Sequence, residues 1–187
     1  HNVYSADILN HYDSKELSQA AAFINPDYDL LYDYAGINLL IKRYLCEYND
    51  HIVELPQDMF LSIALLLEQN ESPATRMAKV RDTYNKLANR KISLGTPLLM
   101  NLRRPNGNLS SCFITMMDDN RDSIFYIIDQ ISAISKFGGG VGVNISRVRC
   151  KGSRIKGIKN ASGGIIPWIR IINDTAVAVN QQGKRKG

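Results

Sequence analysis

Residues 118–145 read DDNRDSIFYIIDQISAISKFGGGVGVNI, and this stretch decides the fold that the sequence predicts. Asp122 is expected to cap a helix that runs to about Lys136. The triple glycine 138–140 ends the helix, and a strand is expected from Val141 to Ile145. One face of the helix is unusually aliphatic and must be buried, in a core or against a partner subunit; it comprises Ile124, Ile127, Ile128, Ile131 and Ile134.

Short extended segments and a second helix flank this stretch. Extended pieces separated by turns are predicted at Ile92–Leu94, Leu98–Leu102 and Ser110–Met116. After the strand, Gly163-Gly164 and Pro167 lead into a helix from Trp168 to about Asn180. The order strand, helix, strand, helix is typical of an α/β fold with parallel strands, so a domain of this class is predicted over residues 92–187.

The preceding region, residues 1–91, is predicted to be a small all-helical domain. Apolar residues recur there at spacings of three and four, which is the helical period. Ser14, Asp33 and Ser72 are the expected caps of three helices, and Pro56 stands where the first residue of another is tolerated.

Charge divides the chain differently from secondary structure. From Lys136 to Gly187 there are eleven Lys or Arg and a single acid, Asp174, which gives this part +10. Because the whole chain carries +5, residues 1–135 carry −5. Cations on short glycine-rich loops attract small anions, phosphates above all, so the C-terminal part indicates a nucleotide site.

Composition excludes several classes of protein. No apolar stretch approaches the roughly 18 residues of a membrane span, and no signal peptide is visible, so a cytoplasmic location without a membrane partner is expected. The cations alternate with glycines and aliphatics and do not line one helix face, which disfavours a nucleic-acid polymer as partner. Cys46, Cys112 and Cys150 lie far apart without a CxxC pair, so neither a disulfide framework nor a metal site is predicted.

Cys112 is the first candidate for chemistry, within Ser110-Ser111-Cys112-Phe113. A free cysteine in a strand is often only a small buried apolar residue. The alternative is a redox thiol beside two hydroxyls that bind a polar substrate. A redox thiol needs a second thiol, and neither Cys46 nor Cys150 is an obvious partner.

Asp118-Asp119-Asn120-Arg121 is the second candidate. Residues of these types before a helix cap it and compensate its dipole. The alternative is that Asp119 accepts hydrogen bonds from a sugar hydroxyl, while Lys136, Arg149 and Lys156 bind phosphates. The glycine turns match neither the dinucleotide fingerprint nor the P-loop, so no kinase or Rossmann enzyme is implied.

Taken in order, these segments resemble the large (alpha) subunit of ribonucleoside-diphosphate reductase. The resemblance covers residues 92–187 well, whereas residues 1–91 are similar to the family's N-terminal helical domain in position and character only. It depends on seven short motifs: Ser93-Leu-Gly-Thr-Pro, Ser110-Ser-Cys-Phe, Asp118-Asp119, Ser135-Lys-Phe-Gly-Gly-Gly-Val-Gly-Val, Arg147-Val-Arg-Cys-Lys-Gly-Ser, Ser162-Gly-Gly-Ile-Ile-Pro and Gln182-Gly-Lys-Arg-Lys-Gly.

The resemblance implies reduction of a ribonucleotide at its 2′ carbon by a thiyl radical, with electrons from a pair of cysteines that become a disulfide. Cys112 matches one member of this redox pair; Thr96, Ser111 and Gly140 match substrate contacts, made by the hydroxyls and a backbone amide. A site for a deoxynucleotide or ATP effector matches Asp119, Asn120, Arg121, Lys136, Arg149, Lys156 and Gly157. A loop that relays effector identity to the substrate base matches Gln181, Gln182, Gly183, Lys184, Arg185 and Lys186.

The resemblance also implies a fold and partners. The fold is a ten-stranded α/β barrel after the helical domain, of which only the opening strands are expected here. Helices 122–136 and 168–180 would form a homodimer contact. The expected partners are a small (beta) subunit whose metal centre supplies the radical, favoured over adenosylcobalamin, and a thioredoxin- or glutaredoxin-type reductant; no cofactor is expected to bind this chain directly.

Several parts of the family pattern have no counterpart in the sequence. The radical cysteine, the second redox cysteine and the tyrosines of the radical path are expected beyond Gly187, and no ATP-cone is visible. The chain alone is therefore expected to be inactive. The alternative function is a noncatalytic nucleotide-binding or subunit-interaction module in which Cys112 is merely packed.

Overall fold

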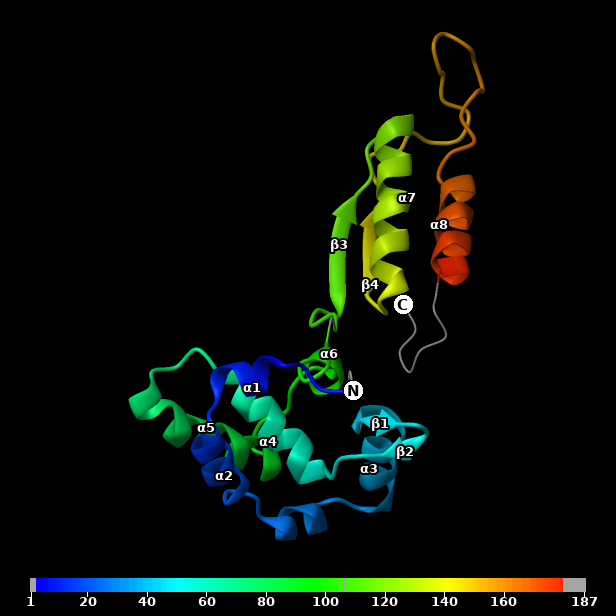
Figure 1. Ribbon diagram of the computed structural model, residues 1–187. Helices are drawn as coiled ribbons and strands as arrows, with labels where there is room; N and C mark the ends of the chain where they lie inside the picture. The colour runs from blue at the N-terminus through cyan, green and yellow to red at the C-terminus, as the bar shows by residue number, and fades with distance from the viewer. Residues whose placement is uncertain (1–2, 106, 180–187) are drawn as a thin grey trace. The chain divides into compact units, whose positions relative to one another are not determined.

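A computed structural model describes residues 3–105 and 107–179 of the chain (Figure 1). It divides into two compact units that meet between Leu109 and Ser110. Sequence reasoning places the domain boundary at residues 91 and 92, where helical periodicity ends. The compact units divide 18 residues later, because the next segment is also helical and packs with the first unit.

The first unit is helical, with one small hairpin. Among the described residues it contains six α-helices, a 3₁₀ helix and a π-helix. The elements are α1 (Asp7–His11), α2 (Ser14–Ala21), η1 (Pro26–Leu31), α3 (Tyr34–Leu39), the π-helix η2 (Leu40–Tyr44), β1 (Glu47–Tyr48), β2 (His51–Ile52), α4 (Pro56–Leu67), α5 (Pro73–Ala88) and α6 (Thr96–Asn101). The predicted all-helical character is therefore confirmed, apart from the hairpin of β1 and β2.

Helix starts follow the expected signals with one shift. The Asp33 carboxylate accepts a hydrogen bond from the Gly36 amide, and Pro56 is the first residue of α4. Asp13, not Ser14, caps α2, because its carboxylate and that of Glu16 form a reciprocal capping box. Such a box satisfies two backbone amides, whereas Ser14 alone would satisfy one.

The predicted extended segment at Leu98–Leu102 is wrong, since α6 occupies Thr96–Asn101. Pro97 lies in the first turn of α6, where its missing amide hydrogen costs nothing. The Leu98 and Leu99 amides donate to the Gly95 carbonyl and start the helix. Pro97 and Met100 are buried, so α6 packs as part of the helical unit.

Helix α4 forms the centre of the helical core. Met59 and Ile63 are completely buried, as are Val80 and Tyr84 of α5, which packs against α4. The Tyr84 hydroxyl donates to Gln57 Oε1 at 2.9 Å and accepts from the Asn25 amide, also at 2.9 Å. The core thus joins α4 and α5 to the chain before η1.

A buried ion pair links distant segments of this unit. The side chains of Glu54 and Arg103 are fully buried and bonded to each other, with Arg103 Nε 3.0 Å from both carboxylate oxygens. Tyr4 donates to the same carboxylate at 2.6 Å, as does the Cys46 amide. The network therefore joins the chain start, the hairpin region and the end of α6.

The environment of Glu54 sets the pH dependence of this network. Burial alone would raise the pKa of the Glu54 carboxyl, but the hydrogen bonds and charge of Arg103 outweigh it and hold the pKa below its usual value. A group with a lowered folded pKa stabilises fully above its unfolded pKa, which is about 4.3 for Glu. This stabilisation is lost as the pH falls through the folded pKa.

The second unit is a strand–helix–strand–helix unit. Its elements are β3 (Cys112–Met116), α7 (Arg121–Lys136), β4 (Gly140–Asn144) and α8 (Ile166–Val179). Strands β3 and β4 pair in parallel, with Cys112 opposite Gly140 and Met116 opposite Asn144. The predicted parallel α/β arrangement is therefore confirmed. The part of the chain that the structure describes has this two-stranded sheet and no closed barrel.

Helix α7 packs on one face of the sheet and α8 packs against α7, and the two helices lie side by side in Figure 1. Val141 and Val143 of β4 contact the buried isoleucines of α7, Ile124, Ile127 and Ile131. Asn120 caps α7 by accepting from the Ser123 amide, so the predicted cap at Asp122 is wrong by two residues. The other face of the sheet is open, with Ile114 91% exposed.

None of the helices within residues 3–105 and 107–179 is long and apolar enough to cross a membrane.

We predict that Arg103→Met destabilises the chain by about 3–5 kcal/mol, because it leaves the Glu54 charge buried without a partner. Urea unfolding followed by circular dichroism at pH 7 measures this change. The matched control is Lys86→Gln, which breaks a half-exposed pair with Asp82 and should cost less than about 1 kcal/mol. Equal losses in the two variants would contradict the account.

Candidate functional site

Cys112 lies at the first position of β3, on the open face of the sheet. Its thiol is exposed and free, and Ser111 Oγ lies 3.4 Å from the sulfur. The expectation that a strand cysteine is simply packed does not fit this position. An accessible thiol next to a hydroxyl is available for reaction with a bound molecule.

The triple glycine builds the opposite wall of this position. A Cβ on Gly139 would lie 2.5 Å from Ile134 Cγ2 and 2.9 Å from Phe113 Cε2, so the turn packs tightly under α7. Gly138 has φ +74°, a conformation that favours glycine. At Gly140, the strand partner of Cys112, the nearest atom to a Cβ would be the Ser111 oxygen at 3.5 Å. The missing side chain therefore leaves the thiol open on its β4 side.

The backbone amide of Gly140 has a different role from the expected one. It donates to the Ser111 carbonyl at 2.8 Å and extends the pairing of the two strands. The amide is therefore already bonded and does not face a ligand. What Gly140 contributes to the site in this structure is the absence of a side chain.

The other two cysteines have different environments. Cys46 is buried in the helical unit, and burial raises the pKa of its thiol, so it is unreactive. Cys150 is exposed and lies 3.2 Å from Ser153 Oγ, in the loop after β4. This loop follows the carboxyl end of β4, about 13 Å along the strands from Cys112. A disulfide needs Cα atoms within about 7 Å, so Cys150 cannot pair with Cys112.

Thr96 belongs to the helical unit. It is the first residue of α6, is half-buried, and its hydroxyl lies 3.3 Å from the hydroxyl of Tyr44.

A pocket of about 380 Å³ opens at the N-terminal end of α7. Asp119 and Arg149 form an ion pair in its wall, with Oδ2 and Nε 2.5 Å apart. Arg149 Nη2 also donates to the Asp119 carbonyl at 3.3 Å, and Nη1 donates to the Arg154 carbonyl. A cation, a carboxylate and a helix N-terminus at one pocket suit a ligand that has both phosphate and hydroxyl groups.

A second ion pair stands beside the first, between Asp118 and Arg147 at 2.7 Å. The two adjacent acids before α7 thus bind two alternate arginines after β4. Both pairs are partly exposed, so each contributes little to stability. Their effect is to hold the two loops that form the pocket in register.

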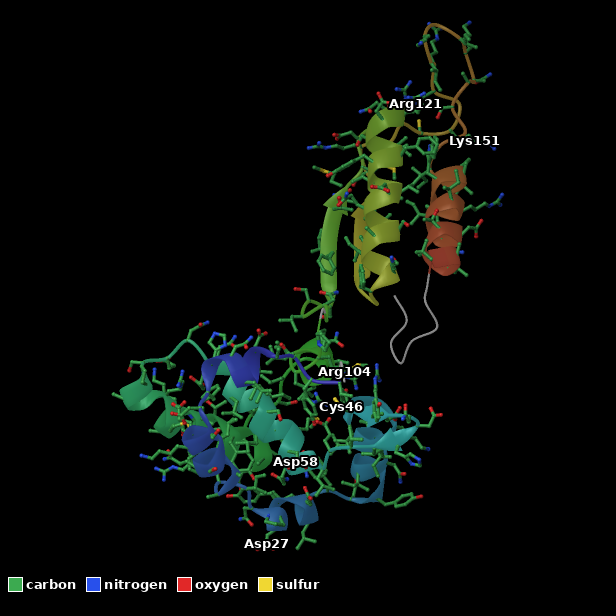
Figure 2. All side chains as sticks on the ribbon, viewed as in Figure 1. Asp27, Cys46, Asp58, Arg104, Arg121 and Lys151 are labelled. Atoms are coloured by element: carbon green, nitrogen blue, oxygen red, sulfur yellow. The ribbon has the colours of Figure 1, made fainter. Side chains whose placement is uncertain are left out.

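The pocket gathers part of the predicted effector site. Asp119, Asn120, Arg121 and Arg149 line it. Arg121 marks the start of α7 in Figure 2, with Lys151 in the loop at the same end of the helix. Lys136 is the last residue of α7, about 22 Å away along the helix, so the same copy of the chain does not bring it to the pocket.

Lys156 and Gly157 form a tight turn next to the pocket. Ile155, which lines the pocket, pairs with Ile158 across them. The φ values of Lys156 and Gly157 are +46° and +84°, as in the two-residue hairpin turns that favour glycine. The turn places Lys156 one residue from the pocket wall.

Seven further residues line this pocket that were not assigned to it from the sequence: Ile124, Val148, Ile155, Ala161, Ser162, Gly163 and Trp168. The signal was the Ser162-Gly-Gly motif, which belongs to the glycine-rich C-terminal part that indicates a nucleotide site, but its residues were not assigned individual contacts. Ser162 is buried, and its hydroxyl accepts from the Gly164 amide at 3.1 Å. It shapes the loop that closes the pocket.

The loop from Gln181 to Lys186 lies beyond the described residues. Among residues 3–105 and 107–179, no group of three His, Cys, Asp or Glu side chains is placed to hold a metal ion.

Each of the two compact units matches a known protein family. The family described as "Ribonucleotide reductase, all-alpha domain" matches residues 30–107, and "Ribonucleotide reductase, barrel domain" matches residues 110–187. These matches divide the chain where the compact units meet. The chain belongs to the ribonucleotide reductase large-subunit family.

Individual proteins similar to this chain are large subunits of the same family. The chain is 52% identical over 184 residues to the ribonucleoside-diphosphate reductase subunit alpha of Synechocystis, covering 98% of the chain and 23% of that protein. It is 41% identical over 186 residues to the subunit alpha of Treponema pallidum, covering 99% of the chain and 22% of that protein. A large chain from Encephalitozoon cuniculi is 37% identical over 180 residues, covering 96% of the chain and 22% of that protein. The chain thus spans less than a quarter of the length of these relatives.

Proposed function

We propose that this chain is a segment of a ribonucleoside-diphosphate reductase large subunit and carries one thiol of its redox pair. The observation that carries the proposal is the exposed Cys112 thiol, opposite a glycine and beside a hydroxyl, in a chain of this family. Of the other two cysteines, Cys46 is buried, and Cys150 lies in the loop that follows β4, near the pocket at the N-terminal end of α7. Cys112 is the thiol whose surroundings leave room for a substrate.

The proposed reaction balances with two thiols. A ribonucleoside diphosphate loses its 2′ hydroxyl as water, and two cysteine thiols lose their hydrogens and become a disulfide. The thiyl radical that starts the reaction, the second redox thiol and the tyrosines of the radical path come from residues outside this chain. We infer that this chain alone is inactive and that an external dithiol of the thioredoxin or glutaredoxin type restores the reduced pair.

Ser111 and Thr96 are proposed to bind the substrate through their hydroxyls. Ser111 Oγ lies close to the thiol, so one ligand can contact both groups. Gly140 is proposed to admit the ribose by leaving the β4 side of Cys112 open. This role replaces the expected hydrogen bond from its amide.

The pocket at the start of α7 is proposed to bind a nucleotide effector, a deoxynucleoside triphosphate or ATP. Asp119 would accept from a ribose hydroxyl, and Arg149 would bind phosphate oxygens. Asp119 and Arg149 form an ion pair with each other, so both side chains are already held at the pocket, and the ligand would replace each as the partner of the other.

A homodimer through α7 and α8 is the proposed assembly. The two helices expose large apolar side chains, among them Phe125, Tyr126, Ile169 and Val177. Lys136, at the far end of α7, would reach an effector only if a second copy supplied it. The small subunit, with a metal-centred radical, is the further partner proposed for the complete protein.

We predict that Cys112→Ser in the complete large subunit abolishes multiple turnover with a thioredoxin-type reductant, because the disulfide can no longer form. Deoxynucleotide formation with the small subunit present measures this loss. The matched control is Cys150→Ser, the other exposed thiol, which should retain wild-type turnover. Full activity of the Cys112 variant would refute the redox role.

We predict that the chain binds deoxynucleoside triphosphates with a preference among bases, and that Asp119→Ala and Arg149→Ala each weaken binding about tenfold or more. Titration calorimetry with dTTP, dGTP, dATP and ATP measures the affinities. Lys159→Ala is the control, because it removes an exposed cation of the same loop that does not line the pocket. Equal losses in all three variants, with affinity following phosphate count alone, would instead support the noncatalytic anion-binding module.

A further inference from the structure

The side chains of Tyr44 and Thr96 meet inside the helical unit. The Tyr44 ring is buried, with 9% exposure, and its hydroxyl lies 3.3 Å from Thr96 Oγ1. We propose that Tyr44 is a positioning residue that fixes the Thr96 hydroxyl for the substrate. This inference rests on the proposed function, in which Thr96 contacts the ribonucleotide.

Tyr44 is held in an unusual backbone segment. It ends the π-helix Leu40–Tyr44, in which the Leu45 amide donates to the Leu40 carbonyl at 3.0 Å. Such wide turns are rare and are frequently found at functional sites, because they rotate side chains out of the regular helical positions. The wide turn follows directly on α3 and directs the Tyr44 hydroxyl to the start of α6.

The buried ion pair fixes this segment. Arg103 Nη2 donates to the Tyr44 carbonyl at 2.5 Å, and the same guanidinium is bonded to Glu54. The Tyr44 backbone is therefore tied to a charged group that cannot move without exposing a buried carboxylate. The position of the Tyr44 hydroxyl is thus set by the core of the unit and not by its surface.

Thr96 needs such a partner because of its place in α6. A threonine inside a helix can bond its hydroxyl to a carbonyl three or four residues earlier. Thr96 is the first residue of α6, and the residues before it are not helical, so this partner is missing. Within residues 3–105 and 107–179, Tyr44 is the side chain that hydrogen-bonds to the Thr96 hydroxyl.

The direction of the hydrogen bond follows from the ligand. When Tyr44 donates to Thr96 Oγ1, the threonine proton remains free to donate to an anionic or hydroxyl oxygen of the substrate. Successive hydrogen bonds of this kind polarise and strengthen each other. Tyr44 therefore acts on substrate binding through Thr96, without touching the substrate.

The test is Tyr44→Phe in the complete large subunit with its small subunit. We expect the KM for the ribonucleoside diphosphate to rise about three- to tenfold with kcat nearly unchanged, as for the loss of one hydrogen bond in binding. Tyr84→Phe is the matched control, because Tyr84 is buried in the same unit but bonds to Gln57. It should lower the melting temperature and leave KM unchanged.

A double-variant cycle with Thr96→Val decides between explanations. If Tyr44 acts through Thr96, Tyr44→Phe has no further effect on KM in the Thr96→Val background. An equal effect in both backgrounds, or no effect of Tyr44→Phe where Thr96→Val raises KM, would overturn the inference and leave the proposed function intact. If Thr96→Val leaves KM unchanged, the substrate role of Thr96 fails, and this inference fails with it.

Thr96→Ser keeps the test decisive if Tyr44→Phe disturbs folding. Serine retains the hydroxyl but loses the methyl group that restricts rotation. A KM close to wild type would show that a hydrogen bond fixes the hydroxyl, as proposed. A KM as high as that of Thr96→Val would show that methyl packing does so, and would overturn the proposal.

Discussion

The parallel pairing of β3 with β4 is the constraint on which the second unit depends. The two five-residue strands pair so that Cys112 lies opposite Gly140 at one end. The loops that line the pocket at the N-terminal end of α7 follow the other end of the strands. Parallel strands require a crossover, and α7 supplies it, which is why Gly138 and Gly139 must fit under the end of that helix. The crossover from β3 through α7 to β4 therefore places Cys112 at one end of the strands and the pocket at the N-terminal end of α7 at the other.

The helical unit depends on a different interaction, the pair of Glu54 and Arg103. A buried pair of charges is costly to form and more costly to break, so it specifies an arrangement more than it stabilises one. Here it fixes the π-helix that holds Tyr44, and through Tyr44 the start of α6. The burial of Glu54 and Arg103 was not predicted from the sequence, because Glu and Arg are usually exposed.

The sequence predicted elements where periodicity and capping agreed, and failed where local chemistry competed. Parallel α/β order and the helices at Pro56 and Ser72 followed from pattern alone. The segment after Gly95 was misjudged because Thr96-Pro97 can open a helix as well as break one. Four of the residues assigned to the effector site from the sequence, Asp119, Asn120, Arg121 and Arg149, line one pocket. Lys136 lies at the other end of α7, as the predicted helix from Asp122 to Lys136 already implied. The role of Tyr44 could not be predicted from the sequence, because a π-helix changes the helical period in one turn only and leaves no recognisable pattern.

The central claim is that Cys112 is a redox thiol, and differential alkylation after a single turnover tests it most directly. The reduced complete large subunit, with its small subunit, would be given substrate without any external reductant, then labelled with an alkylating agent and digested for mass spectrometry. The account predicts that Cys112 becomes protected in proportion to deoxynucleotide formed, while labelling of Cys150 is unchanged. A Cys112 that stays fully labelled after product has formed would contradict it.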